Sequence, residues 1–184
     1  MSHVSVLCIL ADGFEEIEAV TVIDLLRRAE IPVMVAGVEN HKIQGAHQIS
    51  IECDIQLKDV DLDQFTHLFL PGGQPGTDNL KKNKFVIEVI RRFHRARKVI
   101  AAICAAPTVL LEAGIIKNYK ITSYPDERAK FVDSVYIEND VVYDKNVITS
   151  RGVGTAIQFA LYMIESMTDK ETSQTLADRI LYNG

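Results

Sequence analysis

The stretch Val-Ser-Val-Leu-Cys-Ile-Leu at residues 4–10, which runs directly into Ala11-Asp12-Gly13, decides the fold. A continuous apolar and β-branched run of this length predicts a strand buried on both faces, as in the middle of a parallel sheet. Apolar residues then recur at helical spacing over residues 15–29, and the first turn of this segment is acidic, as the helix dipole favours. The sequence therefore begins with a strand, a turn and a helix.

The same alternation of strands and helices continues along most of the chain. Further helices are expected around residues 85–93, after Cys104 up to a C-cap at Gly114, and at 155–166 and 170–181. Strands are expected at 33–38, 67–70, 98–103, 120–123 and 147–150, with a half-exposed hairpin strand at 48–53 and an apparent hairpin between Val135 and Val142. This order predicts an α/β sandwich around a mostly parallel sheet.

Length and composition limit the possible classes of protein. The chain has 184 residues, 47% apolar and 24% charged, which fits a single compact domain over residues 1–184. Its formal charge of −5 disfavours binding to a nucleic-acid backbone. The basic cluster at residues 91–98 falls late in a predicted helix, where cations complement the dipole. Apolar runs are shorter than the roughly 18 to 20 residues of a membrane helix, and no leader pattern begins the sequence, so we expect a cytoplasmic protein without a membrane partner.

The cysteines and the first loop argue against common cofactors. Cys8, Cys53 and Cys104 are too few and too widely spaced for a disulfide framework, and no CxxC or HExxH pattern suggests zinc. The loop at residues 11–16 has one glycine and three acids, where a dinucleotide-binding fold would present a glycine-rich turn. We therefore expect no metal and no organic cofactor, and the cysteines then carry either thiol chemistry or none.

Cys104 lies where such chemistry is most plausible in an open α/β sheet, just beyond the carboxyl end of a strand. Small residues two positions before and after it, Ala102 and Ala106, are typical of a nucleophile on a sharp turn from strand to helix. A helix starting at Ala105 would lower the thiol pKa. Lowering it from about 8.5 to 5.5 needs roughly 4 kcal/mol, which requires a second donor. The alternative is a buried packing cysteine.

Four segments, in order and at compatible spacing, resemble the DJ-1/ThiJ/PfpI superfamily in its DJ-1 and ThiJ-like branch. They are Ala11-x-Gly13-x-Glu15-Glu16-x-Glu18, Leu70-Pro71-Gly72-Gly73, Ala-Ala-Ile-Cys-Ala-Ala-Pro at 101–107 and Thr-Ser-Arg-Gly-x-Gly-Thr at 149–155. The resemblance covers essentially the whole chain. It implies a flavodoxin-like three-layer sandwich with a mostly parallel central sheet, and a homodimer.

The resemblance also implies roles for individual residues. Cys104 would be the reactive nucleophile and Glu18 the acid touching its sulfur, while the amides of Gly72, Gly73 and Ala105 would surround an anion or a carbonyl oxygen. An ionised Glu18 would repel a thiolate, so the carboxyl must be protonated and donate its hydrogen bond. We therefore expect burial to raise the pKa of Glu18. The alternative is an exposed acid that only stabilises the helix dipole.

Two further candidate site residues, Tyr124 and Arg151, each have two possible interpretations. Where many relatives have a histidine near the cysteine, this chain has Tyr124, which removes the usual basis for hydrolase chemistry. Tyr124 would either donate a hydrogen bond to substrate or fill space as a buried aromatic. Arg151 would either hold an anion or tie loops together through backbone carbonyls. His47 corresponds to a pocket-edge position of relatives.

As the resemblance implies, we expect an enzyme acting on reactive dicarbonyls or their adducts. Its activity would be that of a glyoxalase independent of glutathione, with protein deglycase activity as an extension. The partner would be a small reactive carbonyl compound, and nucleic acid would enter only as a glycated substrate. The alternative is a redox-responsive stress or chaperone-like protein that senses oxidation through Cys104. Isocyanide hydration, known in another branch, fits the Glu18 context poorly.

Overall fold

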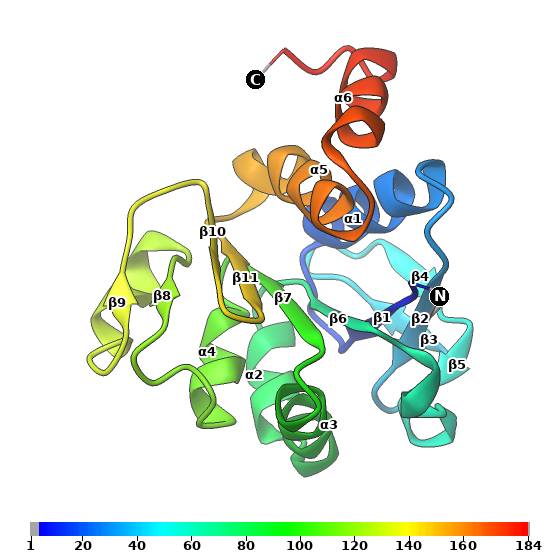
Figure 1. Cartoon of the computed structure of the whole chain (residues 1–184). Coiled ribbons are helices and arrows are strands. Elements are labelled where there is room, and N and C mark those ends of the chain that lie inside the picture. The colour runs from blue at the N-terminus through cyan, green and yellow to red at the C-terminus, as the bar shows by residue number, and fades with distance from the viewer. Residues whose placement is uncertain (1–3, 184) are drawn as a thin grey trace.

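The computed structural model describes residues 4–183, and its centre is a seven-stranded sheet (Figure 1). The strand order is β10-β11-β7-β6-β1-β2-β5, and every neighbouring pair is parallel except β10 and β11. The strands are β1 (Val6–Leu10), β2 (Val33–Gly37), β5 (Ile55–Gln56), β6 (His67–Leu70), β7 (Val99–Ile103), β10 (Val141–Asp144) and β11 (Val147–Ser150). The predicted mostly parallel α/β sheet is confirmed.

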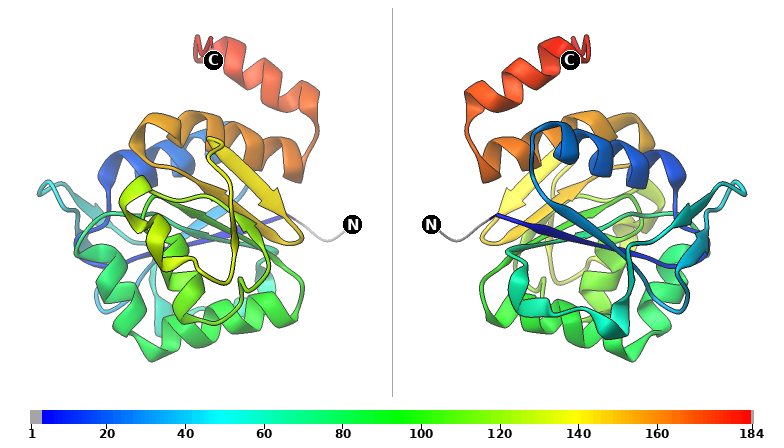
Figure 2. Two further views of the ribbon diagram at one scale, coloured as in Figure 1. Left: turned by 90° about the vertical axis from the view of Figure 1, so that its left-hand side faces the viewer. Right: turned by 90° about the vertical axis from the view of Figure 1, so that its right-hand side faces the viewer.

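Helices cover both faces of this sheet, which gives three layers (Figure 1). One face carries α1 (Glu16–Arg28) and α5 (Ala156–Met167), with α6 (Lys170–Arg179) packed on α5 and projecting beyond them (Figure 2). The other face carries α2 (Gly76–Lys82), α3 (Lys84–Arg95) and α4 (Pro107–Glu112). Among the described residues, no helix combines the length and apolar character that a membrane crossing requires.

Strand β1 shows why its sequence is apolar at every position. Val6, Cys8 and Leu10 pack into the core on the α1 and α5 side of the sheet. Leu7 and Ile9 pack into the core on the α2 and α3 side. All five side chains are fully buried, because helices cover both faces of a central parallel strand.

Two small sheets lie outside the central one. Strands β3 (Lys42–Gln44) and β4 (Ser50–Glu52) form the expected antiparallel hairpin. The predicted hairpin between Val135 and Val142 is wrong. Strand β9 (Val135–Tyr136) pairs in parallel with β8 (Lys120–Ile121), whereas β10 pairs with β11. The apolar pattern marked both segments as extended, but their hydrogen-bond partners lie elsewhere in the chain.

The loops after β1 and β6 are tied together at the carboxyl edge of the sheet. The Glu15 N–H donates to the Gly72 carbonyl at 2.9 Å, and the Gly76 N–H donates to the Gly13 carbonyl at 3.0 Å. Gly73 has φ +93°, and a side chain there would overlap the backbone of Glu15. This close approach fixes the first turn of α1 over the ends of β6 and β7.

Candidate active site

Cys104 occupies the predicted sharp turn after β7. Its φ is +63°, a conformation that costs energy for any residue with a side chain and that persists only where neighbours hold it. Its N–H donates to the Ser150 carbonyl at 3.0 Å, and its carbonyl accepts from the Tyr124 N–H at 2.8 Å. Helix α4 begins at Pro107, two residues later than expected, because residues 104–106 form a turn. Cys104 is partly exposed, so it is not a buried packing cysteine.

Glu18 lies in the first turn of α1 and is fully buried, so it is not an exposed helix-capping acid. Its Oε2 accepts a hydrogen bond of 2.9 Å from the Gly72 N–H. Its Oε1 makes no hydrogen bond to nitrogen or oxygen, which leaves the Cys104 side chain as its polar neighbour. Gly72 lies in contact with both side chains. A Cβ added to it would lie 2.6 Å from Cys104 Cβ and 2.8 Å from Glu18 Oε2.

Burial governs the electrostatics of this pair. It raises the pKa of Glu18 to about 7, although hydrogen bonds from Cys104 and Gly72 act in the opposite direction. The expected rise of the Glu18 pKa is therefore confirmed, with the expected cause. Burial and the Glu18 carboxylate also raise the pKa of the Cys104 thiol, against hydrogen bonds from the amides of Ala105 and Gly73. This is the reverse of the expected depression, which counted the helix terminus and a hydrogen bond from protonated Glu18 but not the burial of the thiol.

The two shifts together mean that the Cys104 and Glu18 pair keeps a single proton above a pH of about 7. Two negative charges in contact at a buried site repel each other, so the pair loses its protons in two widely separated steps. After the first step the pair is either a thiol beside a carboxylate or a thiolate beside a carboxylic acid. A thiolate exists there only while Glu18 keeps the proton.

Cys104 and Glu18 open onto a pocket of about 740 Å³, within the usual range for small-molecule sites. Gly73 and Ala105 line it beside the sulfur. The Gly72 N–H is directed to Glu18, so only two of the three expected amides are available to an anion.

Tyr124 and Arg151 both line the pocket. Tyr124 is 46% exposed, so it is not a buried space-filling aromatic. The Arg151 Nη1 donates to the Glu138 carbonyl at 3.4 Å, which is the loop-tying contact, while the same residue borders the cavity. Neither side chain forms a hydrogen bond with the Cys104 sulfur.

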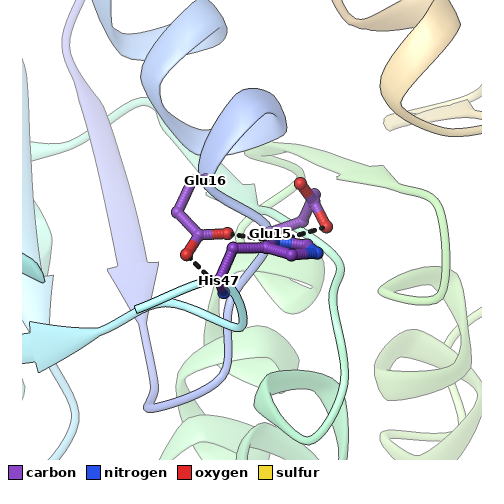
Figure 3. Close-up of side chains that lie close together, drawn as sticks. All are labelled: Glu15, Glu16 and His47. Atoms are coloured by element: carbon purple, nitrogen blue, oxygen red, sulfur yellow. Dashed lines mark hydrogen bonds and ion pairs between the residues drawn. The ribbon is translucent and has the colours of Figure 1, made fainter. Parts of the chain in front are cut away.

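Several residues that line this pocket were given no role from the sequence, and one neighbouring contact was not predicted. Glu15 and Gly152 also line the cavity. Glu15 precedes Glu18 by three residues, and that spacing on one helix face was an available signal. His47 contacts Glu16, with Nδ1 2.8 Å from Oε2 (Figure 3). No local pattern predicts that contact, because 31 residues separate the partners.

Comparison with known proteins agrees with this geometry. Residues 4–166 match the model of the DJ-1/PfpI family. The chain belongs to that family. The resemblance drawn from four short motifs is thereby confirmed, and so is the flavodoxin-like fold.

Three relatives illustrate the similarity. Protein dj-1beta of Drosophila melanogaster is 39% identical over 180 residues, which cover 96% of each chain. Its crystal structure matches with a TM-score of 0.96 over the whole of both chains. A Caenorhabditis elegans protein named glutathione-independent glyoxalase DJR-1.2 is 34% identical over 164 residues, 88% of this chain and 87% of the relative. The structure described as "Toxoplasma gondii DJ-1, oxidized" is 32% identical, with a TM-score of 0.94 over 98% of this chain and all of that one.

Proposed function

We propose that this protein is a glyoxalase that needs no glutathione, with Cys104 as nucleophile and Glu18 as general acid and base. The observation that carries the proposal is the pairing of a partly exposed thiol, on a strained turn, with a buried carboxyl whose pKa is about 7. A carboxyl with that pKa can both donate and accept a proton near neutrality. The glyoxalase name of the Caenorhabditis elegans relative supports the substrate class.

The reaction on methylglyoxal follows from the positions of these groups. The Cys104 thiolate adds to the aldehyde carbon, and the carbonyl electron pair becomes an oxyanion that protonation converts to a hemithioacetal. Glu18 supplies that proton and, now a carboxylate, removes the hydrogen of that carbon as a proton and returns it to the neighbouring carbon, while the hydroxyl proton passes to the neighbouring oxygen. The product is a lactoyl thioester, which water hydrolyses to lactate and the free thiol. The substrate is internally oxidised and reduced, so no external redox cofactor takes part.

The remaining pocket residues stabilise charge and position the substrate in this scheme. The amides of Gly73 and Ala105 lie beside the sulfur and would hold the oxyanion, as preorganised donors do. Tyr124 and Arg151 would contact the far end of a substrate. For glycated amines or thiols, the Cys104 sulfur would replace the amine or thiol at the carbon of the adduct, the amine or thiol would leave with a proton, and the same hemithioacetal would form, so we include deglycation of such adducts.

Lactate formation from methylglyoxal by purified variants tests the proposal. Cys104→Ser should abolish lactate formation, because a serine hydroxyl in this site has no base strong enough to ionise it. Cys53→Ser is the matched control, since Cys53 is a free cysteine that lines no part of the pocket. Turnover by Cys104→Ser at the wild-type rate would overturn the mechanism.

A second candidate function uses the same sulfur as a redox sensor. The thiol is partly exposed and lies beside the amides of Gly73 and Ala105, which could hydrogen-bond the oxygens of a sulfinate. A structural relative was solved in an oxidized form. Mass spectrometry after mild peroxide treatment decides between the candidates: stoichiometric sulfinate at Cys104 without measurable dicarbonyl turnover would favour the sensor.

The free cysteines fit a reducing compartment, and we propose a cytoplasmic location.

We also propose that the protein is a homodimer that associates through an exposed face of α1. Ile17 and Val20 are 54% and 48% exposed, and they continue along one helix face into Asp24 and Arg28, which pair with each other at 2.7 Å. Light scattering should give twice the 20.6 kDa mass of one chain, and Val20→Lys should shift it to the monomer. A monomeric wild type at micromolar concentration would exclude the dimer.

A further inference from the structure

Three side chains of metal-ligand type converge at the start of α1, beside the pocket. Glu15 and Glu16 come from the N-terminal end of the helix, and His47 comes from the loop between β3 and β4 (Figure 3). One ligand atom from each lies within 4.8 Å of the other two. The His47 Nδ1 is 2.8 Å from Glu16 Oε2 and 3.8 Å from Glu15 Oε2, so the imidazole nitrogen is directed at both carboxylates.

Two of the three residues are held in place by the rest of the fold. Glu16 is buried, its Oε1 accepts from the N–H groups of His47 and Ile49, and its side chain fills the space where a Cβ on Gly45 would lie. Its Oε2 is thereby fixed toward the imidazole. Glu15 is positioned by the hydrogen bond from its backbone N–H to the Gly72 carbonyl. The Glu16 carboxylate is therefore positioned before any ion arrives, which lowers the cost of binding.

We propose that Glu15, Glu16 and His47 bind a divalent transition-metal ion of the Zn²⁺ class. An imidazole nitrogen and two carboxylate oxygens suit Zn²⁺, whose ligands lie at about 2.0–2.2 Å and hence about 3.3 Å from one another in a tetrahedron. The distances of 2.8 and 3.8 Å from His47 Nδ1 bracket that spacing, and the ligand atoms of Glu15 and Glu16 lie within 4.8 Å of each other. The ion takes the place of the proton shared by Nδ1 and Oε2. Ca²⁺ and Mg²⁺ prefer oxygen ligands in larger number.

The three side chains can be reached from solvent through His47. The His47 side chain is 68% exposed, so an ion can enter from solvent and keep water at its fourth position. Glu15 also lines the Cys104 pocket, so the ion would sit at the rim of that pocket and connect α1 to the loop between β3 and β4. This proposal is independent of the glyoxalase proposal, because none of its three ligands is the nucleophile or the general acid.

Isothermal titration of Zn²⁺ into the Cys104→Ser protein tests the site, since this background removes the exposed thiol, which would itself bind zinc. One Zn²⁺ should bind per chain. Adding His47→Ala or Glu15→Gln should weaken binding by at least about tenfold, as loss of a ligand interaction does. His41→Ala is the matched control, because His41 is an exposed histidine of the same hairpin region and should leave the affinity unchanged. Excess Ca²⁺ should not compete.

Thermal unfolding provides a second readout that needs no catalytic activity. Zn²⁺ should raise the Tm of Cys104→Ser, because an ion that binds only the folded chain stabilises it by mass action, and the rise should vanish when His47→Ala is added. The proposal is overturned if Cys104→Ser shows no saturable Zn²⁺ binding. It is equally overturned if the His47→Ala and His41→Ala variants bind Zn²⁺ with the same affinity, which would leave the His47–Glu16 contact as an ordinary ion pair.

Discussion

Glu16 and Glu18 are two buried carboxylates in one turn of α1, yet their surroundings have opposite effects. Glu16 is 4% exposed and Glu18 is fully buried, so burial penalises the charged form of both. For Glu16, hydrogen bonds from the His47 side chain and from backbone amides outweigh that penalty and lower its pKa. For Glu18, burial outweighs the hydrogen bonds from Cys104 and the Gly72 amide, and its pKa rises to about 7.

The two carboxyls differ both in the donors that satisfy their charge and in how deeply they are buried, and together these differences separate a structural carboxylate from a reactive one. Glu16 uses both oxygens to hold the loop between β3 and β4, and its charge is satisfied. Glu18 has one oxygen without a nitrogen or oxygen partner, and that oxygen lies next to the only partly exposed cysteine among the described residues. An incompletely satisfied buried acid can exchange a proton at low cost.

The largest expected effect comes from exchanging each carboxyl for an amide. Glu18→Gln should lower kcat for lactate formation by roughly 10²- to 10⁴-fold, because the amide cannot accept and return the substrate proton. Glu16→Gln should keep most of the turnover but lower the free energy of unfolding by about 1–3 kcal/mol, because it weakens hydrogen bonds to a charged group. Steady-state kinetics and urea denaturation of both variants measure the two effects. Equal loss of kcat in the two variants would remove the distinction drawn between these acids.

The second effect is the contribution of Glu18 to the pH dependence of stability. Its pKa of about 7 in the folded chain exceeds its ordinary value of 4.5, so the folded state binds the proton more tightly. Stability from this group is therefore complete below pH 4.5 and is lost as pH rises to about 7. A rise from 4.5 to about 7 corresponds to roughly 3 kcal/mol.

The measurement is the free energy of unfolding from pH 4.5 to 8 for the wild type and for Glu18→Gln. The difference between the two proteins isolates Glu18, since other groups titrate in the same range in both. His67, for example, has a pKa lowered by burial to about 4, and its contribution has the opposite sign. A wild-type curve parallel to that of Glu18→Gln over this range would show that Glu18 ionises normally.

The sequence predicted the part of this arrangement that depends on local pattern. The unbroken apolar run in β1 and the small residues around Cys104 report burial and a tight turn directly, because each position constrains its own surroundings. The opposite behaviour of Glu16 and Glu18 was not predictable in the same way. It depends on the amide of Gly72 and on His47, which come from distant segments of the chain.

The direction of the Cys104 pKa was missed for a related reason. The helix terminus and its amides can be inferred from a strand followed by a helix, and they do lower the pKa of the thiol. Burial of the sulfur and the nearby charge of Glu18 depend on how three loops pack together, and these raise it more. Likewise, the pairing of β9 with β8 rather than β10 follows from long-range contacts that an alternating pattern does not encode.

The smallest effect probes the space around the free Glu18 oxygen. A Cβ at Gly152 would lie 3.6 Å from the Tyr124 ring, 3.9 Å from Glu18 Oε1 and 4.0 Å from Cys104 Sγ, all ordinary contact distances. Gly152→Ala should therefore fold normally, with a change in stability of at most about 1 kcal/mol. The added methyl group partly covers the sulfur and should reduce kcat/KM for methylglyoxal by about tenfold, since misplaced substrate reacts slowly.

Gly154→Ala is the comparison for this variant, because it has the same change two residues away and its added Cβ would meet no atom within 4 Å. Its kcat/KM should fall much less than that of Gly152→Ala. A methyl at Gly45, by contrast, would overlap the Glu16 carboxylate itself. The fold thus leaves room on the Gly152 side of Glu18 Oε1 and none on the Gly45 side of Glu16. If Gly152→Ala and Gly154→Ala turn over methylglyoxal equally well, the open space beside Glu18 is not where the substrate reacts.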